Sequence, residues 1–147
     1  MQTMTRSKRM QPVQHVAKCR EQDAMHKLGQ SQQYLDAQKA KLEELRAYRD
    51  QYANDFAETG GNGVSATRVQ DYRVFLGRLG EAIRQQEALI AQCEAQHEQT
   101  RQQWVDSRSH SQAIGKVIEH CQAEENTVRE RREQQEQDEF SLRKSKK

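Results

Sequence analysis

Two pairs of side chains in this sequence have a spacing that suits metal binding. His15 and Cys19 lie four residues apart, and so do Cys93 and His97. Residues four apart share one face of a helix, so each pair offers two zinc ligands from adjacent turns. Cys93 and His97 have no obvious third or fourth ligand, and they also fit an apolar helical pattern. We therefore expect packed small polar residues there, and no metal.

The sequence lacks the motifs of a nucleotide-hydrolysing enzyme. It contains no GxxxxGK[ST] loop, so any nucleotide hydrolysis must belong to a partner. Its cysteines, Cys19, Cys93 and Cys121, are odd in number and lack CxxC spacing, which is typical of reduced thiols in the cytosol. We predict a protein that is not an enzyme, has no catalytic residues and no cofactor, and acts by binding other proteins.

The composition indicates long helices rather than a compact globule. Of the 147 residues, only 33% are hydrophobic, 31% are charged and one is proline. Burying such a chain in one core would leave many polar groups without partners. Two structural classes remain: a disordered chain, or long helices with a narrow apolar seam. The helices are favoured, because Ala, Gln, Glu, Arg and Lys are abundant.

The charge pattern argues against nucleic acid and membrane partners. The chain has 24 basic and 22 acidic residues, mixed along its length, so no broad basic face is expected. Its apolar runs are too short to span a bilayer, and no apolar stretch follows the basic N-terminal residues as in a secretory signal. Binding to an anionic surface through the basic termini is an alternative, which a steep salt dependence would reveal.

One strong turn signal divides the chain. Gly60-Gly61-Asn62-Gly63 is the only such cluster, and Thr67 with Gln70 after it has the spacing of a capping box. Pro12 suits the first turn of a helix. The predicted single coiled-coil domain, 1–147, comprises a helix at about 11–56, a turn at 57–66, a helix at about 67–140 and a flexible basic tail at 141–147.

Both predicted helices carry a coiled-coil seam. Steps of three and four residues from Val69 to Val128 select mostly apolar positions, although only 33% of the chain is hydrophobic. The first segment shows the same period, and a short loop makes the two helices antiparallel neighbours. The predicted neighbours are Phe56 with Val69, Tyr52 with Tyr72, Leu42 with Ile83, Leu35 with Ile90, and Gln38 with Gln86.

The second predicted helix is longer than the first and should overhang it. By this register the first helix ends opposite about Ser111. The stripe formed by Ile114, Ile118, Cys121 and Val128 then lacks a partner in the hairpin. It requires a partner protein, a second copy of the chain, or the N-terminal residues folding along it.

A second group of aromatic residues flanks the seam on one edge. The register places Tyr34 near Leu89, Lys41 near Ala82 and Tyr48 near Phe75, whereas the opposite edge is polar. Clustered exposed aromatics are typical of a protein-binding site. The alternative is that these residues only widen the core of the hairpin.

The turn and the second helix resemble the FliJ family of flagellar type III export proteins. The resemblance covers nearly the whole chain, and the features outside the heptad pattern are the most specific. The matching residues are Leu28-Gly29, Leu45, Tyr48, Tyr52, Gly61-Asn62-Gly63-Val64, Tyr72, Phe75-Leu76, Leu79, Ala82-Ile83, Trp104 and Asp138-Glu139-Phe140.

The resemblance implies a stalk-like adaptor similar to the central stalk of rotary ATPases. Its terminal end would enter the hexameric ring of the export ATPase FliI, which acts with FliH, and stimulate that enzyme. It would also bind the cytosolic domain of the export gate FlhA and escort export chaperones. The location implied is the cytoplasm, peripherally at the inner face of the cell membrane at the flagellar base, with a role in motility and chemotaxis.

The resemblance also implies two sets of binding residues. The gate-binding set near the turn is Lys41, Leu45, Tyr48, Tyr52, Phe75, Leu79, Ala82 and Gln86. The ATPase-binding set at the terminal end is Ile114, Ile118, Val128, Arg131, Arg132 and Phe140. A generic coiled-coil scaffold, or a stalk protein of a related virulence type III secretion apparatus, is the alternative function.

Overall fold

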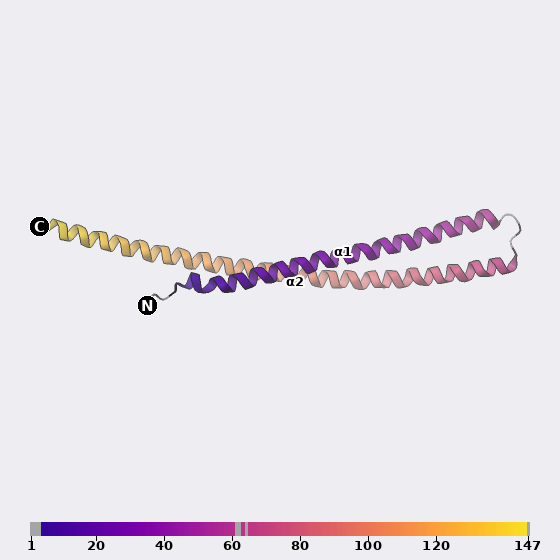
Figure 1. The fold of residues 1–147 in the computed structure, drawn as a ribbon, viewed down its shortest axis with the longest axis horizontal. Helices are drawn as coiled ribbons and strands as arrows, with labels where there is room; N and C mark the ends of the chain where they lie inside the picture. Colours follow the sequence, from indigo (N-terminus) through magenta and orange to yellow (C-terminus); the bar gives the residue numbers. More distant parts are fainter. Residues whose placement is uncertain (1–3, 61–62, 64, 147) are drawn as a thin grey trace. The chain divides into compact units, whose positions relative to one another are not determined.

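Two helices account for nearly all of the described chain. The computed structural model describes residues 4–60, 63 and 65–146, in which α1 spans Arg6–Gly60 and α2 spans Ala66–Ser145 (Figure 1). No strand occurs in these residues. The predicted all-α class is confirmed, and the two helices pack against each other in antiparallel directions.

The helices are longer than predicted at three of their ends. α1 begins at Arg6 rather than near residue 11, so Pro12 lies inside it, and α1 continues to Gly60. The tail predicted to be flexible from residue 141 is helical as far as Ser145. Arg143 and Lys144 lie in this last turn, where basic residues favour a helix because they complement the negative end of its dipole.

The chain separates into two compact units, which are described one at a time. The turn unit contains residues His26–Gln102 and therefore both sides of the turn. The terminal unit contains residues Met1–Met25 and Gln103–Lys147. No helix in the described residues is long and apolar enough to cross a membrane.

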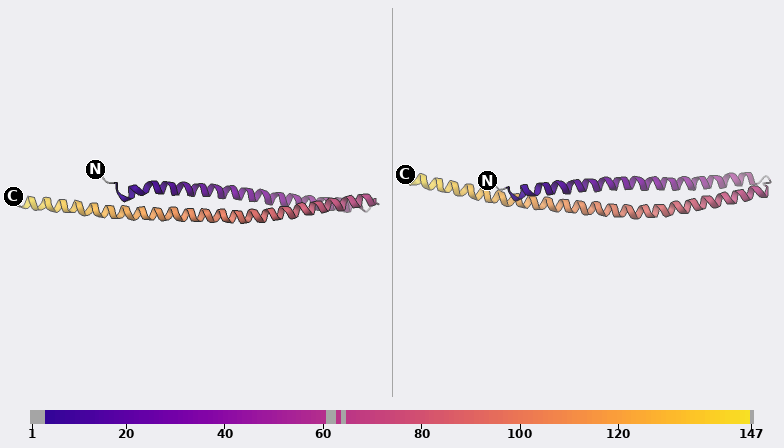
Figure 2. Two further views of the ribbon diagram at one scale, coloured as in Figure 1. Left: turned by 90° about the horizontal axis from the view of Figure 1, so that it is seen from below. Right: turned by 60° about the horizontal axis from the view of Figure 1, so that its bottom comes forward.

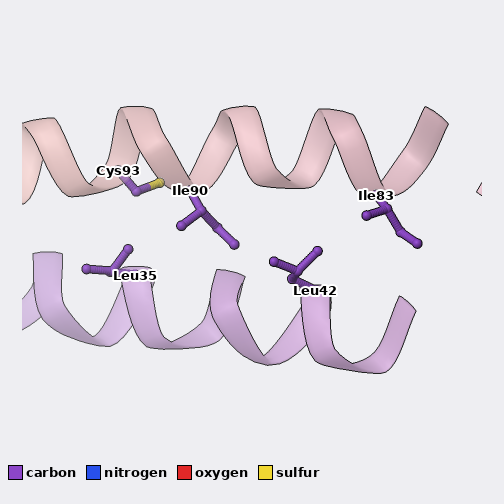
Figure 3. Packing of buried hydrophobic residues seen from close by; sticks show 5 residues of the cluster. All are labelled: Leu35, Leu42, Ile83, Ile90 and Cys93. Carbon is purple, nitrogen blue, oxygen red and sulfur yellow. The ribbon is translucent and has the colours of Figure 1, made fainter. Parts of the chain in front are cut away.

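The core of the turn unit is the predicted seam. Leu35 and Leu42 of α1 face Ile83, Ile90 and Cys93 of α2, and all five side chains are buried (Figure 3). Fully burying one such aliphatic side chain stabilises a fold by about 1.5–3 kcal/mol. The predicted pairs Leu35–Ile90 and Leu42–Ile83 are thus confirmed.

A buried amide pair interrupts this apolar core. Gln38 is 5% exposed. Gln86 Nε2 donates two hydrogen bonds of 2.9 Å, one to the backbone oxygen of Gln38 and one to its side-chain Oε1. A buried polar group is tolerated when it is hydrogen-bonded, as here. The predicted Gln38–Gln86 pair is confirmed.

We expect Gln86→Leu to destabilise the turn unit, because the buried Gln38 amide loses its donor. An unsatisfied buried polar group costs about 1–3 kcal/mol. Replacing both glutamines with leucine should recover most of this loss. Thermal unfolding followed by circular dichroism measures both effects, and equal melting temperatures for the single variant and the unaltered chain would contradict the prediction.

Stacked aromatic rings close the turn unit near the turn. Tyr52 stacks on Tyr72 with ring centroids 5.3 Å apart, which confirms their predicted pairing. Phe56, predicted beside Val69, stacks on Tyr72 at 3.7 Å. The large flat rings therefore fill the space between the helices where they approach the turn.

The cap of α2 differs from the predicted one. The backbone N–H of Arg68 donates to Ser65 Oγ at 3.3 Å, and α2 begins at Ala66. Ser65 is therefore the capping residue rather than Thr67, since serine at this position satisfies an unpaired N–H of the first turn. Of the predicted turn glycines, Gly63 has a φ of 77°, and Gly61 and Asn62 lie outside the described residues.

Two helical glycines in the turn unit are expected to limit its stability. A Cβ added at Gly29 or Gly77 would meet no atom within 4 Å, so alanine fits at both positions. We expect Gly29→Ala and Gly77→Ala to raise the free energy of unfolding by about 1 kcal/mol each, because glycine is a poor helix former. Chemical denaturation measures the gain. Gly63→Ala is the control and should destabilise, since its positive φ disfavours a side chain.

In the terminal unit the start of α1 covers the predicted stripe. Ala17 packs with Ile114 and Ile118 in one buried cluster, and the half-buried Met10 packs against it. Figures 1 and 2 show this part of α1 running alongside α2. Of the three alternatives for covering Ile114 and Ile118, the N-terminal residues fold along them, so the pairing of the helices continues past Ser111.

The first turn of α1 is attached to α2 by polar contacts. Glu125 Oε1 accepts a hydrogen bond of 3.0 Å from the backbone N–H of Ser7, and Oε2 accepts one of 2.7 Å from the Ser7 hydroxyl. Beyond Glu125 every described residue is exposed. The unpaired part of α2 therefore begins after Glu125 instead of at Ile114.

Candidate functional site

The turn unit carries an aromatic edge, defined as Tyr34, Tyr48, Phe75, Ala82 and Leu89. Tyr48 and Phe75 come from different helices, and their rings make an edge-to-face contact with centroids 6.0 Å apart. Aromatic pairs of this geometry are favourable beyond their buried area. The predicted pairing of Tyr48 with Phe75 is confirmed.

The aromatic edge is partly core and partly free surface. Leu89 packs against the buried cluster of the turn unit, as the edge of a wider core would. Tyr34 and Tyr48 are 52% and 53% exposed, although tyrosine can bury most of its ring in a core. The exposed tyrosines thus provide apolar area that the packing of the two helices leaves free.

The opposite edge of the turn unit has a different chemistry. Lys39 Nζ lies 3.8 Å from Glu94 Oε1, and Arg46 Nη2 lies 3.2 Å from Glu87 Oε1, so ion pairs join α1 to α2. Such exposed pairs contribute about 0–1 kcal/mol each to stability. They leave this edge hydrated and charged, in contrast to the aromatic edge.

The structure sorts the predicted gate-binding set by exposure. Lys41 and Tyr48 are exposed and Leu79 is buried. Gln86 is half-buried, and its amide already donates to Gln38. The half-buried members of the set are Leu45, Tyr52, Phe75, Ala82 and Gln86. The members best placed to touch a partner are therefore Lys41, Tyr48 and the exposed part of Phe75. Leu79 lies in the core beneath them.

The predicted ATPase-binding set divides in the same way. Ile114 and Ile118 are 7% and 5% exposed, so α1 covers them and a partner does not reach them in this arrangement. Val128 and Phe140 are 56% and 66% exposed. Arg131 and Arg132 are also exposed, so four of the six residues lie on the unpaired part of α2.

The contact between Ser7 and Glu125 was not predicted. Neither residue is apolar, so apolar spacing does not indicate this contact. The signal available in the sequence was an acidic residue, Glu125, at a seam position. The hydroxyl and the backbone N–H of Ser7 stabilise the carboxylate, and they hold the pKa of Glu125 below its ordinary value of 4.5.

The two Cys–His pairs lie in different surroundings. Cys93 is buried in the core of the turn unit, and His97 Nδ1 lies 3.1 Å from Ser31 Oγ, within hydrogen-bonding distance. His15 Nε2 lies 3.7 Å from the Sγ of the exposed Cys19. Within the described parts of the chain, no group of three or more His, Cys, Asp or Glu residues is placed to hold a metal ion.

Comparison with known proteins gives one match. The family model described as "Flagellar FliJ protein" matches residues 6–147, which include both helices and both candidate surfaces. No curated protein and no solved structure matches the chain. The match agrees with the resemblance found in the turn and second helix, and it extends to the terminal residues.

Proposed function

Because the chain belongs to the FliJ family of flagellar proteins, we propose that it is a stalk-like adaptor between the export gate and the export ATPase. The family is non-enzymatic, helical and associated with flagellar protein export. The flagellar assignment favours this function over a generic scaffold or a virulence-system stalk.

The aromatic edge is the single observation that carries the proposal. Tyr34 and Tyr48 remain about half exposed on one edge, and ion pairs occupy the other edge. Tyrosine is enriched at the centres of protein interfaces because it combines a large apolar ring with a polar hydroxyl. The cytosolic domain of the export gate FlhA is the proposed partner of this edge.

The unpaired part of α2 is the proposed contact with the ATPase FliI. It presents Val128, Arg131, Arg132 and Phe140 to solvent. Exposed apolar side chains between arginines suit a protein surface better than free solution, since arginine and aromatic residues are enriched in interfaces. Stimulation of FliI, which acts with FliH, follows from this contact.

Chaperone escort and the location at the flagellar base complete the proposal. Both rest on the family assignment. A cytoplasmic protein that binds the gate and the ATPase would be held peripherally at the inner face of the cell membrane.

The proposal is tested by binding assays with purified partners. The full chain should retain the gate cytosolic domain and, separately, FliI with FliH. Binding of neither protein at micromolar concentration would overturn it. The salt dependence of binding to DNA or anionic vesicles tests the alternative, because a steep loss of such binding with salt indicates a charged-surface function.

A further inference from the structure

We propose that residues 6–17 of α1 form a reversible strap, which covers an apolar stripe on α2 and is held closed by Ser7 and Glu125. The stripe consists of Ile114, Ile118 and Cys121, which are 7%, 5% and 3% exposed. All of these residues belong to the terminal unit. The strap gives this unit two forms, closed and open, which differ in whether the stripe is accessible.

The contact between Ser7 and Glu125, here called the clasp, consists of one carboxylate that accepts two hydrogen bonds. Glu125 accepts from the Ser7 backbone N–H at 3.0 Å and from the Ser7 hydroxyl at 2.7 Å. The first N–H groups of a helix have no acceptor within the helix, and the positive end of the helix dipole also favours an anion there. Glu125 thus supplies from α2 the cap that the start of α1 needs.

Between the clasp and the apolar cluster the strap contributes few large apolar side chains. Its buried members are Ser7 and Ala17, and Met10 is only half-buried. Gln14 reaches toward Gly115, where its Nε2 lies 3.8 Å from the position of an added Cβ. These side chains bury little apolar area of their own, so the apolar burial here comes mainly from Ile114, Ile118 and Cys121. The clasp adds a polar contact that holds the free end of the strap in place.

Pro12 weakens the strap from within. It lies inside α1 and lacks the N–H that would donate to the carbonyl oxygen of Lys8, so one helical hydrogen bond is missing. The turn that carries Ser7 is therefore less firmly joined to the rest of α1. Loss of the clasp should free this turn first and then Met10.

Cys121 lies under the strap. It falls on the seam between Ile118 and Glu125, and α1 contacts both neighbours. Cys121 is 3% exposed in the closed form, and its thiol becomes accessible when the strap opens. Cys121 therefore reports the state of the strap without any added probe.

The positive charge of Lys8 favours the closed form at neutral pH, because it attracts the carboxylate of Glu125. Lys8 of α1 helps to lower the pKa of Glu125, and Glu124, Arg129 and Arg132 of α2 line the adjoining groove. Because the pKa of Glu125 in the folded chain is lowered, its contribution to closing is fully present above pH 4.5. It is lost as the pH falls through the lower folded pKa.

The test measures thiol labelling in the full chain carrying Cys19→Ser, which removes the exposed cysteine. Cys93, buried in the turn unit, serves as the internal control. Glu125→Ala should accelerate labelling of Cys121 by about tenfold or more, since two hydrogen bonds to a charged group are lost. Labelling of Cys93 should not change.

Glu124→Ala is the matched control, because Glu124 is an exposed neighbour paired with His120. If Glu124→Ala and Glu125→Ala accelerate the labelling of Cys121 equally, the proposal is overturned. It is also overturned if Glu125→Ala accelerates the labelling of Cys93 as much as that of Cys121, because this result indicates global unfolding. Hydrogen exchange provides a second measurement. Residues 6–11 should exchange faster in the Glu125→Ala variant than in the unaltered chain at pH 7, relative to residues 35–42, and an unchanged ratio would contradict the clasp.

Discussion

Replacing Tyr48 and Phe75 together with alanine is expected to weaken binding to the export-gate cytosolic domain by about 30-fold or more, with nearly unchanged helicity. The two rings contact each other across the aromatic edge, and Tyr48 is 53% exposed. Truncating central aromatic residues of an interface commonly costs about 2 kcal/mol or more, which corresponds to about 30-fold in affinity. Titration calorimetry measures the affinity.

The control for this prediction is on the opposite edge. Arg46→Ala with Glu87→Ala removes the 3.2 Å ion pair there and should leave gate binding within about twofold, because exposed pairs contribute little. A circular-dichroism melt separates binding from folding. If the Tyr48 and Phe75 variant loses its cooperative melt, these rings belong to the core and the edge is not a docking site.

Removing the residues after Arg129 is expected to abolish stimulation of the ATPase while both units remain folded. The deletion removes Arg131, Arg132 and Phe140, all exposed, and leaves the Ser7–Glu125 contact in place. Because these residues contribute no buried side chain, the melting temperature should change little. The ATP hydrolysis rate of purified FliI, with and without the shortened chain, measures the effect.

The position of the cut decides what this experiment tests. A cut after Ile118 would also remove Cys121 and Glu125, which belong to the contact with α1. A cut after Leu142 is the control, since it removes only the basic end and should retain stimulation. Undiminished stimulation by the chain cut after Arg129 would exclude the unpaired part of α2 as the activating contact.

The sequence predicts the core of the turn unit well because its period is strict. Aligning the two seams about the turn predicts Leu35 beside Ile90, Gln38 beside Gln86 and Tyr48 near Phe75. These contacts are all present. In a coiled coil each such position faces the partner helix, so one correct pair fixes the others. The candidate aromatic edge follows from the same register.

The start of α1 was not predictable in this way. Pro12 predicts the first turn of a helix that begins at about residue 11, whereas α1 begins at Arg6. The contact that fixes this extra turn is polar, between Ser7 and Glu125, and apolar spacing does not reveal it. Apolar spacing alone therefore leaves open which surface covers Ile114 and Ile118, and the structure shows that α1 does. The choice of Ser65 over Thr67 as cap is also decided by local backbone geometry.

The buried glutamine pair has a consequence for how related sequences can diverge. Gln86 donates to two oxygens of Gln38, so each residue is acceptable only while the other is present. A leucine at one position leaves a buried amide without its partner, whereas leucine at both restores an apolar layer. The two positions are therefore epistatic, and they should covary among family members. Where both become apolar, this layer loses its hydrogen bonds and is held by apolar packing alone.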